Sequence, residues 1–173
     1  MAHVVIINGT NSESSRIQGV QQYIEQHVEE ARSIEVYKLP AQALVTADYT
    51  NEVIQAANRL IEQAQVIIIL TPVYKASYTG ILKTFLDLIP QKGLENKVIL
   101  PIMVGGSAHH LLVIEYALKP VLSVLGATTI LQGVYLIDQS IERTAHGFTI
   151  QEEARERLQS QLQKLRKEPI FLS

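Results

Sequence analysis

Cysteine is absent from this 173-residue sequence. The chain therefore forms no disulfide and uses neither a thiolate nucleophile nor a cysteine-ligated metal. An excess of charge of one sign is also missing, since the formal net charge is −2 and the pI is about 6.2. This balance lacks the basic surface that is typical of proteins that bind nucleic acid or an anionic membrane.

Long apolar runs are missing too. The longest ones are far shorter than the roughly 20 residues that cross a bilayer. The first residues, MAHVVIINGT, have neither the basic segment nor the long apolar segment of a secretory signal, so we expect a cytoplasmic protein without a membrane partner. The composition that is present, 47% apolar and 18% charged, is globular, and the length suits one domain spanning residues 1–173.

Short apolar runs alternate with longer segments of helical periodicity, which is the signature of βαβ units. The predicted strands are Val4–Ile7, Ile34–Lys38, Val66–Leu70, Val98–Val104 and a segment within Thr128–Ile137. The predicted helices are Ser14–Ala31, Thr50–Ala64, Tyr78–Ile89, His110–Leu125 and Gln151–Lys167. This alternation predicts a flavodoxin-like α/β fold, a three-layer sandwich around a five-stranded parallel sheet of order 2-1-3-4-5.

Single residues add local expectations. Thr50 is the predicted N-cap of its helix, and Val53 and Ala57 are expected on the core face of that helix. Pro101 lies inside a predicted strand and has no N–H to donate, so we expect a β-bulge or a locally missing hydrogen bond there. In the last helix the apolar spacing predicts an inward face, formed by Ala154, Leu158, Leu162 and Leu165.

Ligands of such a sheet bind beyond the carboxyl ends of the strands, where the loops after Ile7, Leu70 and Val104 meet. The first loop, NGTNSESSR, matches neither a GxGxxG dinucleotide motif nor a P-loop. Its hydroxyl groups lead into a helix, whose exposed N–H groups and positive dipole end favour an anion such as phosphate. Thr10, the serines at 12, 14 and 15, and Arg16 could add donors. The alternative is that these residues only cap the helix and form turns.

The other two loops carry weaker signals. The second, TPVYKASYTG, offers the rigid Pro72 and the aromatic Tyr74, against which a planar ring could rest. In the third, VGGSAHH, Gly105 and Gly106 allow either a close approach of the backbone to a ligand or a turn with positive φ. The two histidines that follow lack further ligands at metal spacing, so we expect no metal site.

Three segments, TPVYKASYTGILKTFLDLIP, KVILPIMVGGSAHHLL and EYALKPVLSVLGA, resemble the NADPH-dependent FMN reductases of the alkanesulfonate-utilisation type. The similarity covers nearly the whole chain and weakens after about Ile137. The resemblance implies a flavodoxin-like fold, NADPH as hydride donor and FMN as a loosely held substrate. It also implies a homodimer or homotetramer that hands reduced flavin to a partner monooxygenase.

The resemblance also implies a set of site residues. Those expected around the FMN phosphate are Thr10, Ser12, Ser15, Arg16 and Gln18. Those expected along the isoalloxazine ring are Pro72, Val73, Tyr74 and Lys75, with Gly105, Gly106 and Ser107 on its pyrimidine side. One member of the resembled family carries an arginine in the first loop where this chain has Ser12, which leaves Arg16 as the main positive charge.

Pro120 interrupts an otherwise helical segment. It cannot donate to the carbonyl of Tyr116, so a kink or π-bulge is expected around that residue. The segment is apolar on nearly every side, which favours burial in a subunit interface. In the resembled family this tyrosine lies in a π-helix at the subunit interface.

The flavin carries the chemistry in cofactor enzymes of this kind, so we expect no catalytic side chain. The mechanism we expect is hydride transfer from nicotinamide C4 to flavin N5, with backbone N–H groups of the second and third loops stabilising the developing charge. Three alternatives stay open: an FMN-bound quinone or azo-dye reductase, a flavodoxin-type electron carrier, and a non-enzymatic flavin-binding or assembly protein.

Overall fold

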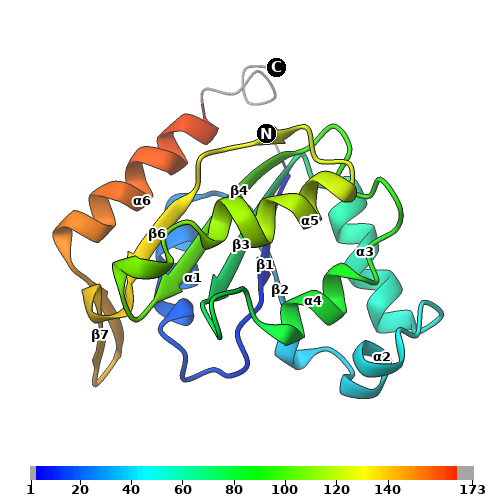
Figure 1. The fold of residues 1–173 in the computed structure, drawn as a ribbon, viewed down its shortest axis with the longest axis horizontal. Coiled ribbons are helices and arrows are strands. Elements are labelled where there is room, and N and C mark those ends of the chain that lie inside the picture. Colours follow the sequence, from blue (N-terminus) through cyan, green and yellow to red (C-terminus); the bar gives the residue numbers. More distant parts are fainter. Residues whose placement is uncertain (1–2, 167–173) are drawn as a thin grey trace.

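A computed structural model describes residues 3–166 of the chain (Figure 1). Its central sheet is parallel, with the order β2-β1-β3-β4-β5, and β6 also pairs with β4. The strands are β1 (Val4–Asn8), β2 (Arg32–Glu35), β3 (Val66–Pro72), β4 (Val98–Gly105), β5 (Thr129–Ile130) and β6 (Val134–Ile137). The predicted fold class and strand order are therefore confirmed.

Helices cover both faces of this sheet. The α-helices are α1 (Ile17–His27), α2 (Ala41–Thr46), α3 (Glu52–Gln63), α4 (Gly80–Leu86), α5 (Lys119–Val124) and α6 (Glu152–Leu165). Short 3₁₀ turns are η1 (Val36–Lys38), η2 (Ala108–His110) and η4 (Asp138–Ser140), and η3 (Ile114–Leu118) is a π-helix. Figure 1 shows α1 and α6 on one side of the sheet and α3, α4 and α5 on the other.

Each strand of the sheet centre sends alternate side chains to two separate cores. In β1, Val5 and Ile7 pack in the core beneath α3, α4 and α5, whereas Val4 and Ile6 pack beneath α1 and α6. The same alternation runs along β3, where every residue is buried. Burial on both faces explains why these strands are continuous runs of β-branched residues rather than alternating patterns.

The boundaries of several predicted elements are wrong. The first helix is shorter than Ser14–Ala31, and the third predicted helix, Tyr78–Ile89, is only Gly80–Leu86. The predicted strand Ile34–Lys38 ends at Glu35 and continues as η1, and α2 was not predicted. These differences arise because the flanking turns share the apolar spacing of the elements beside them.

The start of α3 also differs from the prediction. Asn51, not Thr50, is its N-cap, and the Asn51 side chain accepts the N–H groups of Val53 at 3.0 Å and Ile54 at 3.4 Å. Its core face contains Ile54 and Ala57, while Val53 is 48% exposed. The buried face therefore keeps the predicted Ala57, and Ile54 takes the place that was predicted for Val53.

Pro101 produces the predicted irregularity, but on one side only. Between β3 and β4 the register is continuous, with Pro101 opposite Ile69. On the other side Ile99 pairs with Ile130, and Ile102 pairs with Val134. An advance of three residues along β4 therefore matches an advance of four residues along the segment that contains β5 and β6. This extra residue is a bulge, and it separates β5 from β6 at the point where the proline has no N–H to donate.

The helix interrupted by Pro120 contains the predicted π-bulge. The π-helix η3 spans Ile114–Leu118 and has Tyr116 at its centre, and α5 begins directly after it with Pro120 in its first turn. The proline is tolerated there because the first turn of a helix needs no N–H donor. Gly126 ends α5 with φ of +95°, as expected of a helix-terminating glycine.

The segment after β6 forms a hairpin and a helix. The hairpin pairs β7 (Ile141–Thr144) with β8 (Gly147–Ile150) in antiparallel fashion, and the sequence pattern did not predict it. In α6 the four predicted inward residues are all buried, which confirms that face, although Lys167 lies outside the described residues. No helix within residues 3–166 is long and apolar enough to cross a membrane.

Candidate functional site

A cavity of about 270 Å³ lies at the carboxyl ends of β1, β3 and β4, where the three predicted loops meet. Eight of the predicted site residues line it: Ser12, Ser15, Arg16, Pro72, Val73, Tyr74, Gly105 and Gly106. Ser14 and Val104 line it as well, and so do Asp138 and Arg143 from the segment after β6. Tertiary structure thus brings together residues from four separate parts of the chain.

Buried polar contacts fix the start of the first loop. Asn8 Nδ2 donates to Gln21 Oε1 at 2.7 Å, and Asn8 Oδ1 accepts the N–H of Thr10 at 3.0 Å. Gly9 has no room for a side chain, since a Cβ there would lie 2.7 Å from Leu82 Cβ. These contacts fix the path of the loop before its exposed serines begin.

Thr79 ties the second loop to the first. It is fully buried, and its hydroxyl donates to the carbonyl oxygen of Gly9 at 2.5 Å. The Thr79 hydroxyl oxygen also accepts the N–H of Leu82 at 3.2 Å and so caps the N-terminus of α4. One side chain therefore sets the distance between two walls of the cavity.

The N-terminus of α1 opens onto the cavity. Arg16 is its N-cap and makes no capping bond from its side chain, the Ser15 hydroxyl accepts the N–H of Ile17 at 3.3 Å, and no acidic residue lies in the first turn. By contrast, α3 begins with a capping asparagine and Glu52, and α6 begins with two glutamates. The positive end of the α1 dipole is therefore left without a protein anion, which favours a bound one.

A buried hydroxyl of the first loop lacks a partner. Thr10 is fully buried, and its Oγ1 makes no hydrogen bond to any of the described residues. A buried hydroxyl without a partner loses the hydrogen bonds that water would give it. Thr10 does not itself line the cavity but lies next to the serines that do.

The second loop turns tightly after Pro72. Tyr74 and Ser77 exchange two backbone hydrogen bonds at 2.9 and 3.1 Å across a two-residue turn. Both central residues, Lys75 with φ of 49° and Ala76 with φ of 60°, are left-handed, as in a type I′ turn. This turn presents Tyr74 at the cavity with 51% of its surface exposed, while Lys75, also predicted beside the flavin, is not part of the lining.

The two glycines of the third loop have different roles. A Cβ on Gly105 would lie 2.0 Å from the Tyr135 hydroxyl, whereas one on Gly106 would meet no atom within 4 Å. Neither has a positive φ, so the expectation of a left-handed turn there is wrong. Gly105 therefore makes room for Tyr135, and only Gly106 leaves backbone open beside the cavity.

Tyr135 shapes the third loop by donating its hydroxyl to the carbonyl oxygen of Ser107 at 2.6 Å. Burial raises the pKa of this phenol, and the charge of Asp138 raises it further, so the hydroxyl keeps its proton. Ser107 was predicted beside the flavin but is not part of the cavity lining.

Gln18 lies in a different hydrogen-bond group from the one that the resemblance implies. Its Nε2 donates to Glu35 Oε1 at 3.3 Å and to Tyr37 Oη at 3.5 Å, and it does not line the cavity. Burial raises the pKa of the Glu35 carboxyl, but the hydrogen bond and charge of Lys38, with smaller contributions from Tyr37 and Gln18, lower it below its ordinary value. Gln18 therefore supports a carboxylate rather than a phosphate here.

Sequence reasoning missed the two charged residues that come from the segment after β6. Arg143, on β7, donates from its guanidinium to the carbonyl oxygen of Ser14 and lines the cavity. Arg16 is joined to the same hairpin, since its Nε donates to the Ile141 carbonyl at 2.9 Å. Arg143 lies 129 residues from Ser14 in the sequence, so no local pattern joins the two. The basic side chain itself was the only signal in the sequence that could have pointed to Arg143.

His109 and His110 lie in the 3₁₀ turn η2 beyond the third loop. Within residues 3–166 no group of three or more His, Cys, Asp or Glu side chains is close enough to hold a metal ion. The two histidines are not part of the cavity lining either.

Two larger hollows of about 710 Å³ lie elsewhere on the molecule. One is at the amino ends of the strands, beside Lys97, whose Nζ donates to the carbonyls of Glu62 at 2.9 Å and Ala64 at 2.7 Å. That lysine closes the C-terminus of α3, and burial lowers its pKa. Because this hollow lies at the wrong end of a parallel sheet, we assign it no ligand.

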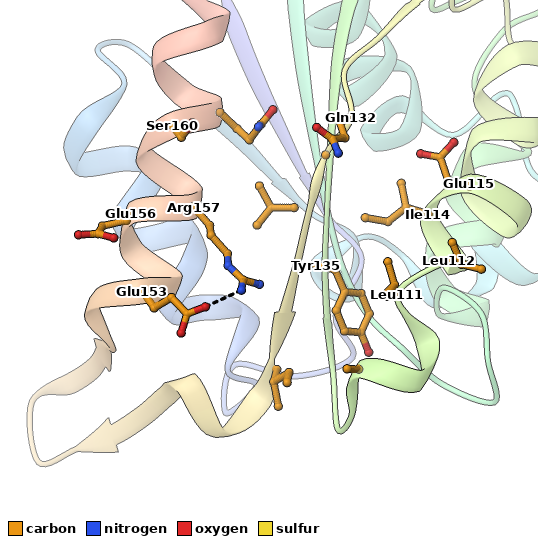
Figure 2. A pocket seen from close by; sticks show the side chains of 15 residues that line it. Leu111, Leu112, Ile114, Glu115, Gln132, Tyr135, Glu153, Glu156, Arg157 and Ser160 are labelled. Carbon is orange, nitrogen blue, oxygen red and sulfur yellow. Dashed lines mark hydrogen bonds and ion pairs between the residues drawn. The ribbon is translucent and has the colours of Figure 1, made fainter.

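The other hollow is a groove along the edge strand β6, shown in Figure 2. Leu111, Leu112 and Ile114 stand on one side of it, and Glu153 and Arg157 of α6 stand on the other. Leu111 and Leu112 are each 55% exposed, and Tyr116 on the adjoining π-helix is 79% exposed. The groove thus has an apolar side, continued by Tyr116, and a charged side, and it lies beside the loop cavity rather than within it.

Comparisons with known proteins agree with this geometry. The family described as NADPH-dependent FMN reductase matches residues 2–142. A relative named FMN reductase (NADPH) from Pseudomonas putida strain KT2440 is 41% identical over 142 residues, which cover 80% of this chain and 72% of the relative. Its namesake from Escherichia coli strain K12 is 37% identical over 143 residues, 80% of this chain and 74% of that one.

Among solved structures, the apo form of an NADH:FMN oxidoreductase (EMOB) has the same fold. It matches with a TM-score of 0.83 and 29% sequence identity, over 96% of this chain and 89% of that one. The range matched by the family includes all three loops around the cavity.

Proposed function

The chain belongs to the NADPH-dependent FMN reductase family, and from this premise we propose that it reduces FMN with NADPH at the cavity between the loops after β1, β3 and β4. The observation that carries the proposal is the gathering of hydroxyl groups, Arg16 and the N-terminus of α1, whose first turn holds no acidic residue, around one cavity. A phosphate is the group that such an arrangement binds best.

The residues present fit a phosphorylated flavin. Ser12, Ser15 and Arg16 would hold the phosphate, and Thr10, whose buried hydroxyl lacks a partner, stands directly before them. The cavity by itself, at about 270 Å³, is close to the lower limit for a small-molecule site. It therefore suits the phosphate end of the ligand, while the isoalloxazine ring would rest on the more open loop surface beyond.

That surface is supplied by the second and third loops. Pro72, Val73 and Tyr74 would lie along the ring, with Gly106 on its pyrimidine side. When bound, FMN supplies the redox chemistry by accepting hydride at N5 from nicotinamide C4. The protein's part is to hold the ring in place and leave one face open to NADPH.

Backbone N–H groups that face the ring must be free to donate. Those of Val73 and Tyr74 are already donated, to the carbonyls of Val104 at 2.9 Å and Ser77 at 2.9 Å. Those of Gly106 and Ser107 make no hydrogen bond to the described residues. The loop after β4 is therefore the better source of donors for charge that develops on the pyrimidine side.

A homo-oligomer forms part of the proposal. Four large apolar side chains are exposed within residues 111–124, namely Leu111, Leu112, Val124 and Tyr116 at the centre of the π-helix, and exposed apolar side chains of this kind support a contact with a second chain. Pro120 keeps this π-helix in place. The mass measured by light scattering on a size-exclusion column should exceed that of one chain, and Tyr116→Arg should reduce it.

We also propose that reduced flavin leaves the enzyme and serves a flavin-dependent monooxygenase, as the resemblance implies. The open loop surface supports release, because nothing among residues 3–166 closes over Tyr74, which is half exposed. A two-enzyme assay in which the chain supports a purified monooxygenase through free flavin alone would establish this role.

The proposed activity is tested by NADPH consumption with and without added FMN, together with the absorbance of the protein as isolated. Colourless protein that consumes NADPH only after FMN is added is the expected result. Yellow protein that needs a quinone or an azo dye would indicate a bound flavin and a different acceptor. FMN binding without any NADPH consumption would contradict the reductase and favour an electron carrier.

A further inference from the structure

Arg143 reaches the candidate phosphate cavity from outside the sheet. It lies on β7, in the hairpin after β6, and its guanidinium donates to the carbonyl oxygen of Ser14 in the first loop. The side chain lines the cavity together with Ser12, Ser15 and Arg16. Figure 1 shows this hairpin at the same end of the molecule as the loop after β1.

The hairpin is held firmly against α1. A Cβ on Gly19 would lie 2.6 Å from Phe148 Cβ and 3.2 Å from Ile141 Cγ2, so the hairpin packs in a place that only a glycine leaves open. Ile141 is fully buried and its carbonyl accepts the Nε of Arg16 at 2.9 Å. The position of Arg143 is therefore set by a packed element rather than by a free loop.

The two arginines leave a positive charge at the cavity. Among the described residues neither Arg16 nor Arg143 forms an ion pair with a carboxylate. Asp138 also lines the cavity, so the formal charge of the lining side chains is two positive and one negative. Each guanidinium group has five N–H donors and uses one of them in a hydrogen bond to a backbone carbonyl. Further N–H donors of both groups therefore remain for a ligand.

We propose that the β7–β8 hairpin completes the FMN phosphate site and that Arg143 is its second phosphate-binding cation. This inference rests on the proposed function, and it assigns a role to a segment for which the sequence indicated none. The first loop itself contains one arginine, and a dianionic phosphate needs more than one cation to balance its charge. Arg143 lies directly beyond the range matched by the family, residues 2–142.

The test compares FMN with riboflavin, which has the same ring and lacks the phosphate. Dissociation constants are measured by flavin fluorescence for the unmodified chain, Arg143→Ala, Arg143→Lys and the control Arg155→Ala. Arg155 lies on α6, is half exposed, and among residues 3–166 forms an ion pair with Glu152 alone, so it matches Arg143 in charge and in being exposed but not in position.

Loss of Arg143 should raise the FMN dissociation constant about tenfold, the effect of one charge-assisted hydrogen bond, and leave that for riboflavin unchanged. Arg143→Lys should recover part of the loss, because lysine keeps the charge without the planar fork. Arg155→Ala should bind both flavins as the unmodified chain does.

An unchanged FMN constant for Arg143→Ala would overturn the role of Arg143. Equal weakening of FMN and riboflavin would also overturn it, because the side chain would then only support the loop. A failure of the proposed function is seen separately, since the unmodified chain would then either bind no FMN or bind it without consuming NADPH.

Discussion

Thr79 offers the sharpest test of how the cavity is built. Its hydroxyl makes two buried hydrogen bonds, one to the Gly9 carbonyl at 2.5 Å and one from the Leu82 N–H at 3.2 Å. The first joins the second loop to the first loop, and the second caps α4. Valine has nearly the same shape and no hydroxyl, so Thr79→Val removes both bonds with little change of volume.

The expected cost is the sum of two effects. Loss of an N-cap costs about 1 kcal/mol. A buried carbonyl left without its donor costs about 1–3 kcal/mol more. Thr79→Val should therefore lower the free energy of unfolding by about 2–4 kcal/mol.

Urea denaturation measures this change as a lower midpoint with an unchanged slope. Thr84→Val is the matched control, because Thr84 lies on the same helix, is half buried, and donates only to the Ile81 carbonyl at 2.7 Å within one turn. That control should lose less than about 1 kcal/mol. A loss for Thr79→Val no larger than for Thr84→Val would refute the reasoning that this hydroxyl joins the two loops.

Three other substitutions test the arguments about backbone and charge. Gly133 has φ of +85° and a β4 carbonyl oxygen 2.6 Å from where a Cβ would lie, so Gly133→Ala should cost about 2–4 kcal/mol in urea denaturation, while Gly106→Ala leaves stability unchanged. Ala76, with φ of 60°, should accept glycine with a gain of about 0.5 kcal/mol; a loss would contradict strain in that turn. Burial raises the pKa of Glu35, but Lys38 lowers it more, so the folded pKa lies below 4.5. The stability that Glu35 contributes is therefore present above about pH 4.5 and lost as the pH falls through the folded pKa, and Glu35→Gln should flatten this part of the stability curve.

Sequence patterns determined those features that depend on neighbouring residues. The β-branched runs at Val4–Ile7 and Val66–Leu70 could only be strands buried on both faces. The spacing of Ala154 to Leu165 determined the inward face of α6, and Pro120 determined that the helix must either kink or bulge around Tyr116. Each of these follows from local geometry, either a repeat along the chain or one missing N–H.

Element ends were harder to predict than element types. Thr50 and Asn51 are both good caps and lie side by side, and only packing of Ile54 rather than Val53 against the sheet chose between them. Pro101 predicted an irregularity but not its side. The extra residue lies on the side of β4 that pairs with the short strands β5 and β6, whereas the pairing of β4 with β3 is continuous.

The sequence by itself determined the fold class, the strand order and the three loops that form the cavity, because these follow from periodicity and from the rules of parallel sheets. Only the tertiary structure decided which side chains of those loops face one another. Gln18 turns to Glu35, Gly105 makes room for Tyr135, and Arg143 joins the first loop across 129 residues. Contacts between distant segments depend on how packed elements meet, and no pattern along the chain records that.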